Sequence, residues 1–137
     1  MRNPVLAIAT LLAILVAGFF VLGPGYKWKA RSFFKQLQQC TTAAQIQEWA
    51  LEEIERADGK QVEIVSIPSF LDAPDGGPPN SASIEYNDGE PYLVATWDGG
   101  FGHWGLLVGS SSLEYPYGDC YHVEWTPGVY VWHEIQK

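Results

Sequence analysis

An uncharged apolar run near the N-terminus limits what this chain can become. Residues 4–25 read PVLAIATLLAILVAGFFVLGPG and contain no charged side chain. The eighteen residues Val5–Leu22 would rise about 27 Å as a helix, close to the thickness of the hydrocarbon core of a bilayer. We therefore predict a transmembrane anchor over residues 1–26, with Tyr26 and Trp28 as interfacial aromatic residues.

A cleaved signal peptide is the competing interpretation of the same run. Signal peptides carry apolar regions of about 7–15 residues, which is shorter than this one. Residues suitable for cleavage are poorly placed, because Leu15-Val16-Ala17 begins with a bulky side chain and Val21-Leu22-Gly23 is followed by Pro24. The sequence thus favours an uncleaved, single-pass anchor.

The charges that follow the run are strongly segregated. Residues 27–35 hold four bases and no acid, which predicts a basic juxtamembrane segment over residues 27–41. From Gln36 onward three bases face all sixteen acids, a net charge of −13, so residues 42–137 are expected to form an acidic globular domain. Such a domain repels phosphate backbones, which excludes nucleic acid as a partner. Contact with the membrane is expected through residues 5–22, and a protein partner is possible.

The sequence constrains only weakly the side of the membrane on which the globular domain lies. Four bases follow the apolar run, whereas Arg2 and the α-amine precede it, so the positive-inside rule slightly favours a cytoplasmic domain. A short N-terminal tail with Arg2 is also typical of signal anchors, which export the domain behind them.

Beyond the basic segment the periodicity changes from helical to strand-like. Residues 29–39 continue as a helix, and Thr42–Gln45 fits a capping box for a second, amphipathic helix that ends near Gly59. Asn87-Asp88-Gly89 is a strong hairpin signal, and a second hairpin is expected around Thr126-Pro127-Gly128. Strands are predicted over residues 62–67, 83–87, 92–97, 104–109, 121–125 and 129–135.

The predicted fold class is α+β. An N-terminal transmembrane helix precedes one packed amphipathic helix and an antiparallel meander sheet of about five or six strands. The helix should cover one face of the sheet, with the other face half exposed to water. The expected contacts join Ile46, Trp49 and Ile54 to Leu93, Ala95 and Trp97.

The strand His103-Trp104-Gly105-Leu106-Leu107-Val108-Gly109 resembles the histidine-bearing strand of papain-like cell-wall peptidases and of the lecithin:retinol acyltransferase family. The resemblance implies a cysteine-dependent hydrolase or acyltransferase, in which His103 activates a thiolate at Cys120. It covers seven residues, and the chain departs from the family in three ways. Cys120 is expected to begin a strand instead of a helix, only seventeen residues separate it from His103, and the sequence identifies no polar residue that would orient the histidine.

A metal site is a further hypothesis. His122 and Glu124 point to the same side of a strand, because residues two apart share a face. If a two-residue Pro127-Gly128 turn closes the hairpin, His133 falls opposite His122, and the three side chains could hold Zn²⁺ or Fe²⁺. A three-residue turn would place His133 opposite Tyr121 and disperse the cluster.

We expect a non-enzymatic interaction module, with the hydrolase or acyltransferase and the metal-binding domain as alternatives. The sequence contains no cofactor motif and no complete catalytic set. Binding is expected at Phe101, His103 and Trp104, in and beside the glycine-rich loop after Asp98, or on an aromatic face of the sheet.

Overall fold

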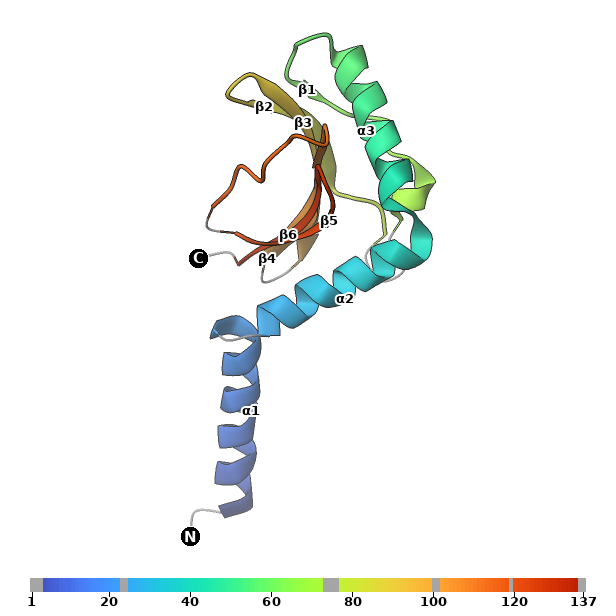
Figure 1. Cartoon of the computed structure of the whole chain (residues 1–137). Helices are drawn as coiled ribbons and strands as arrows, with labels where there is room; N and C mark the ends of the chain where they lie inside the picture. The colour runs from blue at the N-terminus through green and yellow to red at the C-terminus, as the bar shows by residue number, and fades with distance from the viewer. Residues whose placement is uncertain (1–3, 23–24, 73–76, 100–101, 119, 136–137) are drawn as a thin grey trace.

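The computed structural model describes residues 4–22, 25–72, 77–99, 102–118 and 120–135 (Figure 1). They form three α-helices, one short 3-10 helix and a six-stranded antiparallel sheet, which confirms the predicted α+β class. In chain order the elements are α1 (Pro4–Leu22), α2 (Gly25–Cys40), α3 (Ala43–Ala57), β1 (Val62–Glu63), η1 (Ser69–Leu71), β2 (Ser81–Asn87), β3 (Glu90–Gly99), β4 (Gly102–Gly109), β5 (Tyr121–Thr126) and β6 (Val129–Ile135).

The sheet departs from a meander at its last hairpin. The strand order is β1-β2-β3-β4-β6-β5, so β6 pairs with β4 and leaves β5 at the edge. The predicted hairpin signals are correct in detail. Asp88 and Gly89 both adopt positive φ in the turn between β2 and β3, as a type I′ turn requires. Only Val62–Glu63 of the predicted first strand is paired, so β1 is a short edge strand.

The helix α3 begins where the sequence predicts. The hydroxyl of Thr42 accepts a hydrogen bond from the backbone N–H of Gln45 at 3.2 Å, which satisfies one of the donors that a helix start leaves unpaired. The other half of the capping box is replaced, because the side-chain oxygen of Gln45 accepts from the hydroxyl of Thr41. The helix ends at Asp58 and Gly59, both with positive φ.

Helices α2 and α3 cover one face of the sheet, as Figure 1 shows. The main core lies between them and this face, which we call the helix face. Phe33 and Leu37 of α2 are buried there, although they belong to the basic segment, together with Ile46 of α3. The predicted contacts are present, since Leu93, Ala95 and Trp97 lie in the same cluster and Trp49 and Ile54 pack against it.

The opposite face of the sheet, which we call the far face, is less exposed than a half-solvated sheet would be. The connection between β4 and β5 crosses it and places Leu113 against Leu107. Tyr92, Tyr130 and Trp132 complete a second, smaller hydrophobic cluster. The far face is therefore apolar in its middle and polar at its margins.

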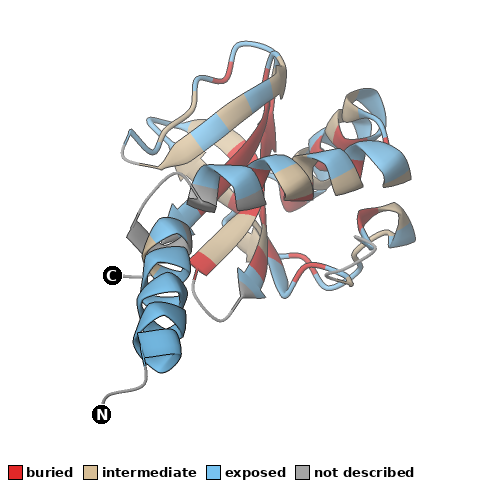
Figure 2. Cartoon of the chain, turned by 90° about the horizontal axis from the view of Figure 1, so that it is seen from below, coloured by how far each residue is buried: buried red, intermediate tan, exposed pale blue. Residues whose placement is uncertain are grey.

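The helix α1 projects away from this body (Figures 1 and 2). Its described large apolar side chains from Val5 to Phe19 are 50–71% exposed, and the ribbon of this helix is mostly pale blue in Figure 2. Within the described part of the chain, no helix combines the length and the apolar character that a membrane crossing requires, so the predicted span stays a prediction.

Candidate functional site

Asp98 and His103 form a pair at one margin of the far face. They lie opposite each other at the end of β3 and the start of β4, and directly paired residues point to the same face of a sheet. The Nδ1 atom of His103 lies 2.5 Å from Oδ1 of Asp98. The pair is solvent-accessible, with side-chain exposures of 30% for His103 and 53% for Asp98. Asp98 is thus the orienting group that sequence reasoning did not find.

The pairing register of the β3–β4 turn is the feature that would have identified Asp98 from the sequence. Gly99 pairs with Gly102, so a short glycine-rich reversal brings residues 98 and 103 together. On the other side of His103, Glu134 of β6 is its cross-strand partner and is exposed on the same face. The imidazole therefore lies in a row between two carboxylates.

Cys120 lies near the same margin of the sheet. It immediately precedes β5, whose first residue, Tyr121, pairs with His133, the neighbour of Glu134. Cys120 and His103 therefore lie on the two sides of β6, with backbones about 10 Å apart at the usual spacing of strands. The two predicted catalytic residues therefore lie at the same margin of the sheet with Glu134 of β6 between them, and of these two residues His103 is the one that Asp98 contacts.

The immediate neighbour of the Cys120 side chain is Tyr115. The Tyr115 hydroxyl is buried without a well-formed hydrogen bond among the described residues. Burial first, and then the adjacent Cys120 side chain, raise the pKa of Tyr115 well above its ordinary value. Tyr115 is therefore a neutral phenol at physiological pH, a potential hydrogen-bond donor beside the thiol.

Tyr115 also organises a group of rings that we call the aromatic cluster, made of Tyr115, Tyr117, His122 and Tyr130. The Tyr115 ring stacks on His122 with centroids 3.8 Å apart and meets the rings of Tyr117 and Tyr130 at 5.9 and 5.5 Å. Tyr117 and His122 are exposed at its surface. The cluster covers the far face between Cys120 and the apolar centre.

Beneath the aromatic cluster, Trp132 leaves a polar group without a partner. Its side chain is 8% exposed, and its Nε1–H has no hydrogen-bond acceptor among the described residues. A buried unpaired donor costs roughly 1–3 kcal/mol, so Trp132 lowers the stability that its apolar burial contributes.

The three predicted metal ligands are not brought together. Of the two turn lengths considered, the two-residue turn at Pro127 and Gly128 forms, since Thr126 pairs with Val129. A bulge at Trp125 then shifts the register by one residue and places His133 opposite Tyr121. His122 and Glu124 consequently lie on the far face, whereas His133 points to the helix face.

His133 is instead a packed core histidine. It is 4% exposed and stacks on Trp104, with ring planes 2° apart and centroids 6.1 Å apart. No group of three histidine, cysteine, aspartate or glutamate side chains suited to a metal ion occurs in the described ranges.

The three predicted binding residues occupy different places. Phe101 lies outside the described residues. His103 is on the far face, whereas Trp104 is half-buried on the helix face beside Phe33, with ring centroids 6.2 Å apart. Trp104 therefore contributes to the core and does not share a surface with His103.

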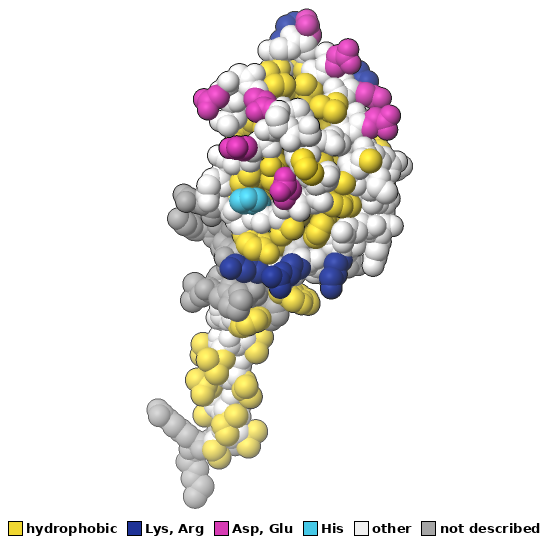
Figure 3. Space-filling view, viewed as in Figure 1, with side chains coloured by type: hydrophobic (Ala, Val, Ile, Leu, Met, Phe, Trp, Pro, Cys, Tyr) yellow, Lys and Arg dark blue, Asp and Glu magenta, His cyan; other side chains and the backbone are white. Residues whose placement is uncertain are grey.

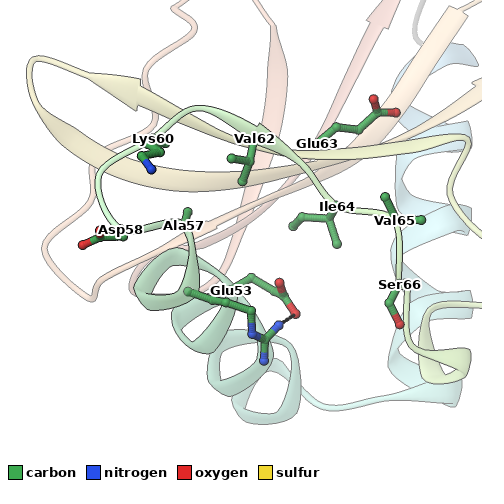
Figure 4. A pocket seen from close by; sticks show the side chains of 10 residues that line it. Glu53, Ala57, Asp58, Lys60, Val62, Glu63, Ile64, Val65 and Ser66 are labelled. Carbon is green, nitrogen blue, oxygen red and sulfur yellow. Dashed lines mark hydrogen bonds and ion pairs between the residues drawn. The ribbon is translucent and has the colours of Figure 1, made fainter.

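A pocket that the sequence did not indicate lies between the end of α3 and β1. Figure 4 shows the segment from Ala57 to Ser66 curving around it, with Glu53 on the helix side. Arg56, which forms an ion pair with Glu53, also lines the pocket. It measures about 500 Å³ and is broadly open to solvent. Its lining mixes acids, bases and short apolar side chains, so no single ligand chemistry is selected there.

Comparisons with protein families, with curated proteins and with solved structures found no match to this chain.

Proposed function

We propose that the chain is a single-pass, membrane-anchored interaction module that presents the far face of its sheet to a protein partner. The observation that carries the anchor is the exposure of α1. Nine large apolar side chains of this helix are exposed, namely Val5, Leu6, Ile8, Leu11, Leu12, Ile14, Leu15, Val16 and Phe19.

Lipid offers the burial that these side chains lack. Burying a single valine, leucine, isoleucine or phenylalanine side chain stabilises a protein by roughly 1.5–3 kcal/mol. Nine such side chains left in water therefore represent a large unfavourable free energy, on the order of 10 kcal/mol or more. An isolated helix of this length is also marginal in water, whereas in lipid its backbone hydrogen bonds are favoured.

The length of α1 bears directly on this placement, because no described helix reaches the length and apolar character of an ordinary membrane span. Its 19 residues rise about 28 Å, at the short end of the range for helices embedded in bilayers. A short apolar helix is accommodated by local thinning of the bilayer or by flanking side chains that reach the interface.

The far face supplies the interaction surface. Its described residues include no lysine or arginine, while its margins expose five side chains that are acidic or aromatic, namely Asp98, Glu114, Tyr117, Glu124 and Glu134. Aromatic side chains are enriched in interfaces, and an acidic rim selects a partner with a basic or neutral surface.

Two experiments test the two parts of this proposal. For the anchor, membranes containing the full chain are washed at alkaline pH, and the chain should stay with the lipid. Chain recovered in the aqueous fraction with an N-terminus near Tyr26 would contradict the anchor. A reporter at the C-terminus should be active on the cytoplasmic side, and activity on the opposite side would overturn that placement.

For the interaction surface, crosslinking in intact membranes compares two charge reversals of equal size. Glu124→Lys with Glu134→Lys alters the far face and should remove the crosslinked partner. Glu48→Lys with Glu52→Lys alters the exposed side of α3 and should keep it. Partner capture that survives the far-face reversal would exclude this surface.

A thiol-dependent acyl hydrolase or transferase is the second candidate, favoured by the hydrogen bond between Asp98 and His103. His103 would accept the thiol proton of Cys120 once the two side chains come within hydrogen-bond reach. The thiolate would attack the acyl carbon of an ester or amide, whose leaving alcohol or amine would take up the proton from His103. Alkylation by iodoacetamide near neutral pH tests the activation. Cys120 should react much faster than Cys40, and His103→Ala should abolish the difference. Equal rates for the two cysteines would remove this candidate.

A further inference from the structure

The exposed side of α2 carries a line of basic residues. Lys27, Arg31 and Lys35 are four residues apart in sequence and all three are exposed. Residues at this spacing follow one another along one side of a helix. Another side of α2 is buried in the core through Ala30, Phe33 and Leu37, so the orientation of the basic side is fixed by packing.

The line of basic residues on α2 lies close to the apolar helix α1. Figure 3 shows the basic side chains in a row where the apolar helix meets the body, with the acidic side chains farther away. The helix α2 contains no acid, and it turns steeply away from α1 (Figure 1). Trp28, which is 61% exposed, lies beside the basic row and suits the interface between lipid and water.

We propose that the basic row of α2 binds the headgroups of anionic phospholipids and holds α2 along the membrane surface. This inference rests on the proposed membrane anchor, since α1 in lipid would bring the basic row to headgroup level. Anionic lipid complements the three positive charges, whereas the acidic body, with its net charge of −13 beyond Gln36, is repelled by the same surface.

The opposite charges of the basic row and the acidic body orient the domain on the membrane. The basic row is attracted to the anionic surface and the acidic body is repelled, so the domain is held in one orientation instead of rotating freely on its tether. Lys27 is additionally placed by the ring of Tyr121, whose centroid lies 5.6 Å from its ammonium nitrogen. Since Tyr121 begins β5, this edge strand would lie nearest to the membrane.

The test measures how near the far end of α2 lies to the headgroups. The full chain, with Cys40→Ser and Cys120→Ser, carries a fluorophore at Gln38→Cys. Gln38 is exposed, follows Lys35 by three residues and lies about 20 Å along the helix from its start. Nanodiscs contain a lipid with a quencher on its headgroup, in phosphatidylcholine alone or with phosphatidylserine.

Quenching should be strong in the discs with phosphatidylserine, and weak in phosphatidylcholine or at high salt. A triple variant should quench equally in both kinds of disc; it carries Lys27→Gln, Arg31→Gln and Lys35→Gln. Each base strengthens binding to an anionic surface about fivefold, so removal of all three should weaken it on the order of 100-fold. The matched control, Arg56→Gln with Lys60→Gln, removes two exposed bases outside α2 and should behave as the parent.

Quenching that is independent of lipid charge, or that persists in the triple variant, would overturn the headgroup contact alone. Loss of the chain from both kinds of disc would overturn the anchor as well as the contact. A circular dichroism spectrum and melting curve equal to those of the parent exclude unfolding of the triple variant as the cause of lost quenching.

Discussion

Gly105 of β4 lies directly against the indole ring of Trp132 on β6. A Cβ atom at position 105 would come within 2.9 Å of the ring atom Cζ2 and within 2.2 Å of the carbonyl oxygen of Ala95. The close approach lets Trp132 cover the centre of the far face, and it requires a residue without a side chain at position 105.

Substitution of this glycine should therefore destabilise the sheet. We expect Gly105→Ala to lower the free energy of unfolding by roughly 3 kcal/mol or more, because backbone and ring must both move. Denaturant titration of the full chain in detergent measures the loss. Gly118→Ala is the matched control, since a Cβ atom there meets nothing within 4 Å, and its free energy of unfolding should stay within about 0.5 kcal/mol of the parent.

The cap of α3 offers a more local prediction. Thr42→Ala removes the hydroxyl that accepts the N–H of Gln45, so it should cost about 1 kcal/mol of the free energy of unfolding. Thr42→Ser keeps an oxygen at the same place and should retain most of that stability. The same denaturant titration distinguishes them, and equal losses in both variants would show that the hydroxyl makes no contribution as a cap.

These two sites illustrate what the sequence could and could not predict. The cap at Thr42 and the turn at Asp88 and Gly89 depend on neighbouring residues, so their chemistry is readable in a short stretch of sequence. The insertion of β6 between β4 and β5 depends on contacts between distant segments. One of these contacts is the packing of Trp132 over Gly105, which no short sequence pattern predicts.

In the candidate site, too, some features could be predicted from the sequence and others could not. A regular hairpin register would have placed His133 opposite His122, and one bulged residue, Trp125, moved it to the other face. The pairing of Asp98 with His103 needed only the length of a glycine-rich turn, so it was accessible from sequence once that register was considered. The covering of the far face by the connection between β4 and β5 was not accessible, because such a connection has no periodicity.

Tyrosines on the far face should make the fold sensitive to high pH. Burial raises the pKa of Tyr117 above its ordinary value, and the hydrogen bond with Tyr92 and the charge of Glu85 raise it further. Burial is also the main cause of the raised pKa of Tyr92. The unfolded chain therefore loses these protons first, at about pH 10, and the stabilisation present below that pH is lost progressively as the pH rises further.

Absorbance of tyrosinate, followed during alkaline titration of the folded chain, checks this prediction. Glu85→Gln should move the titration of the two tyrosines to lower pH, since it removes a negative charge that disfavours ionisation. Glu48→Gln, on the exposed side of α3, should leave the curve unchanged. Superimposable curves for the parent and Glu85→Gln would contradict the assigned role of Glu85.

The contact between Asp98 and His103 fixes which ring nitrogen carries the proton. An ionised carboxylate only accepts hydrogen bonds, so the neutral His103 ring should donate from Nδ1 and leave Nε2 as the acceptor. Nitrogen NMR of the imidazoles distinguishes the two tautomers, and Asp98→Ala should release His103 from the Nδ1–H form. His122 provides the internal reference, because its Nδ1 lies 3.2 Å from the carbonyl oxygen of Cys120 and does not depend on Asp98. An Nε2–H tautomer at His103 in the parent would show that Asp98 does not orient the ring, and it would remove the observation that favours the thiol-dependent candidate.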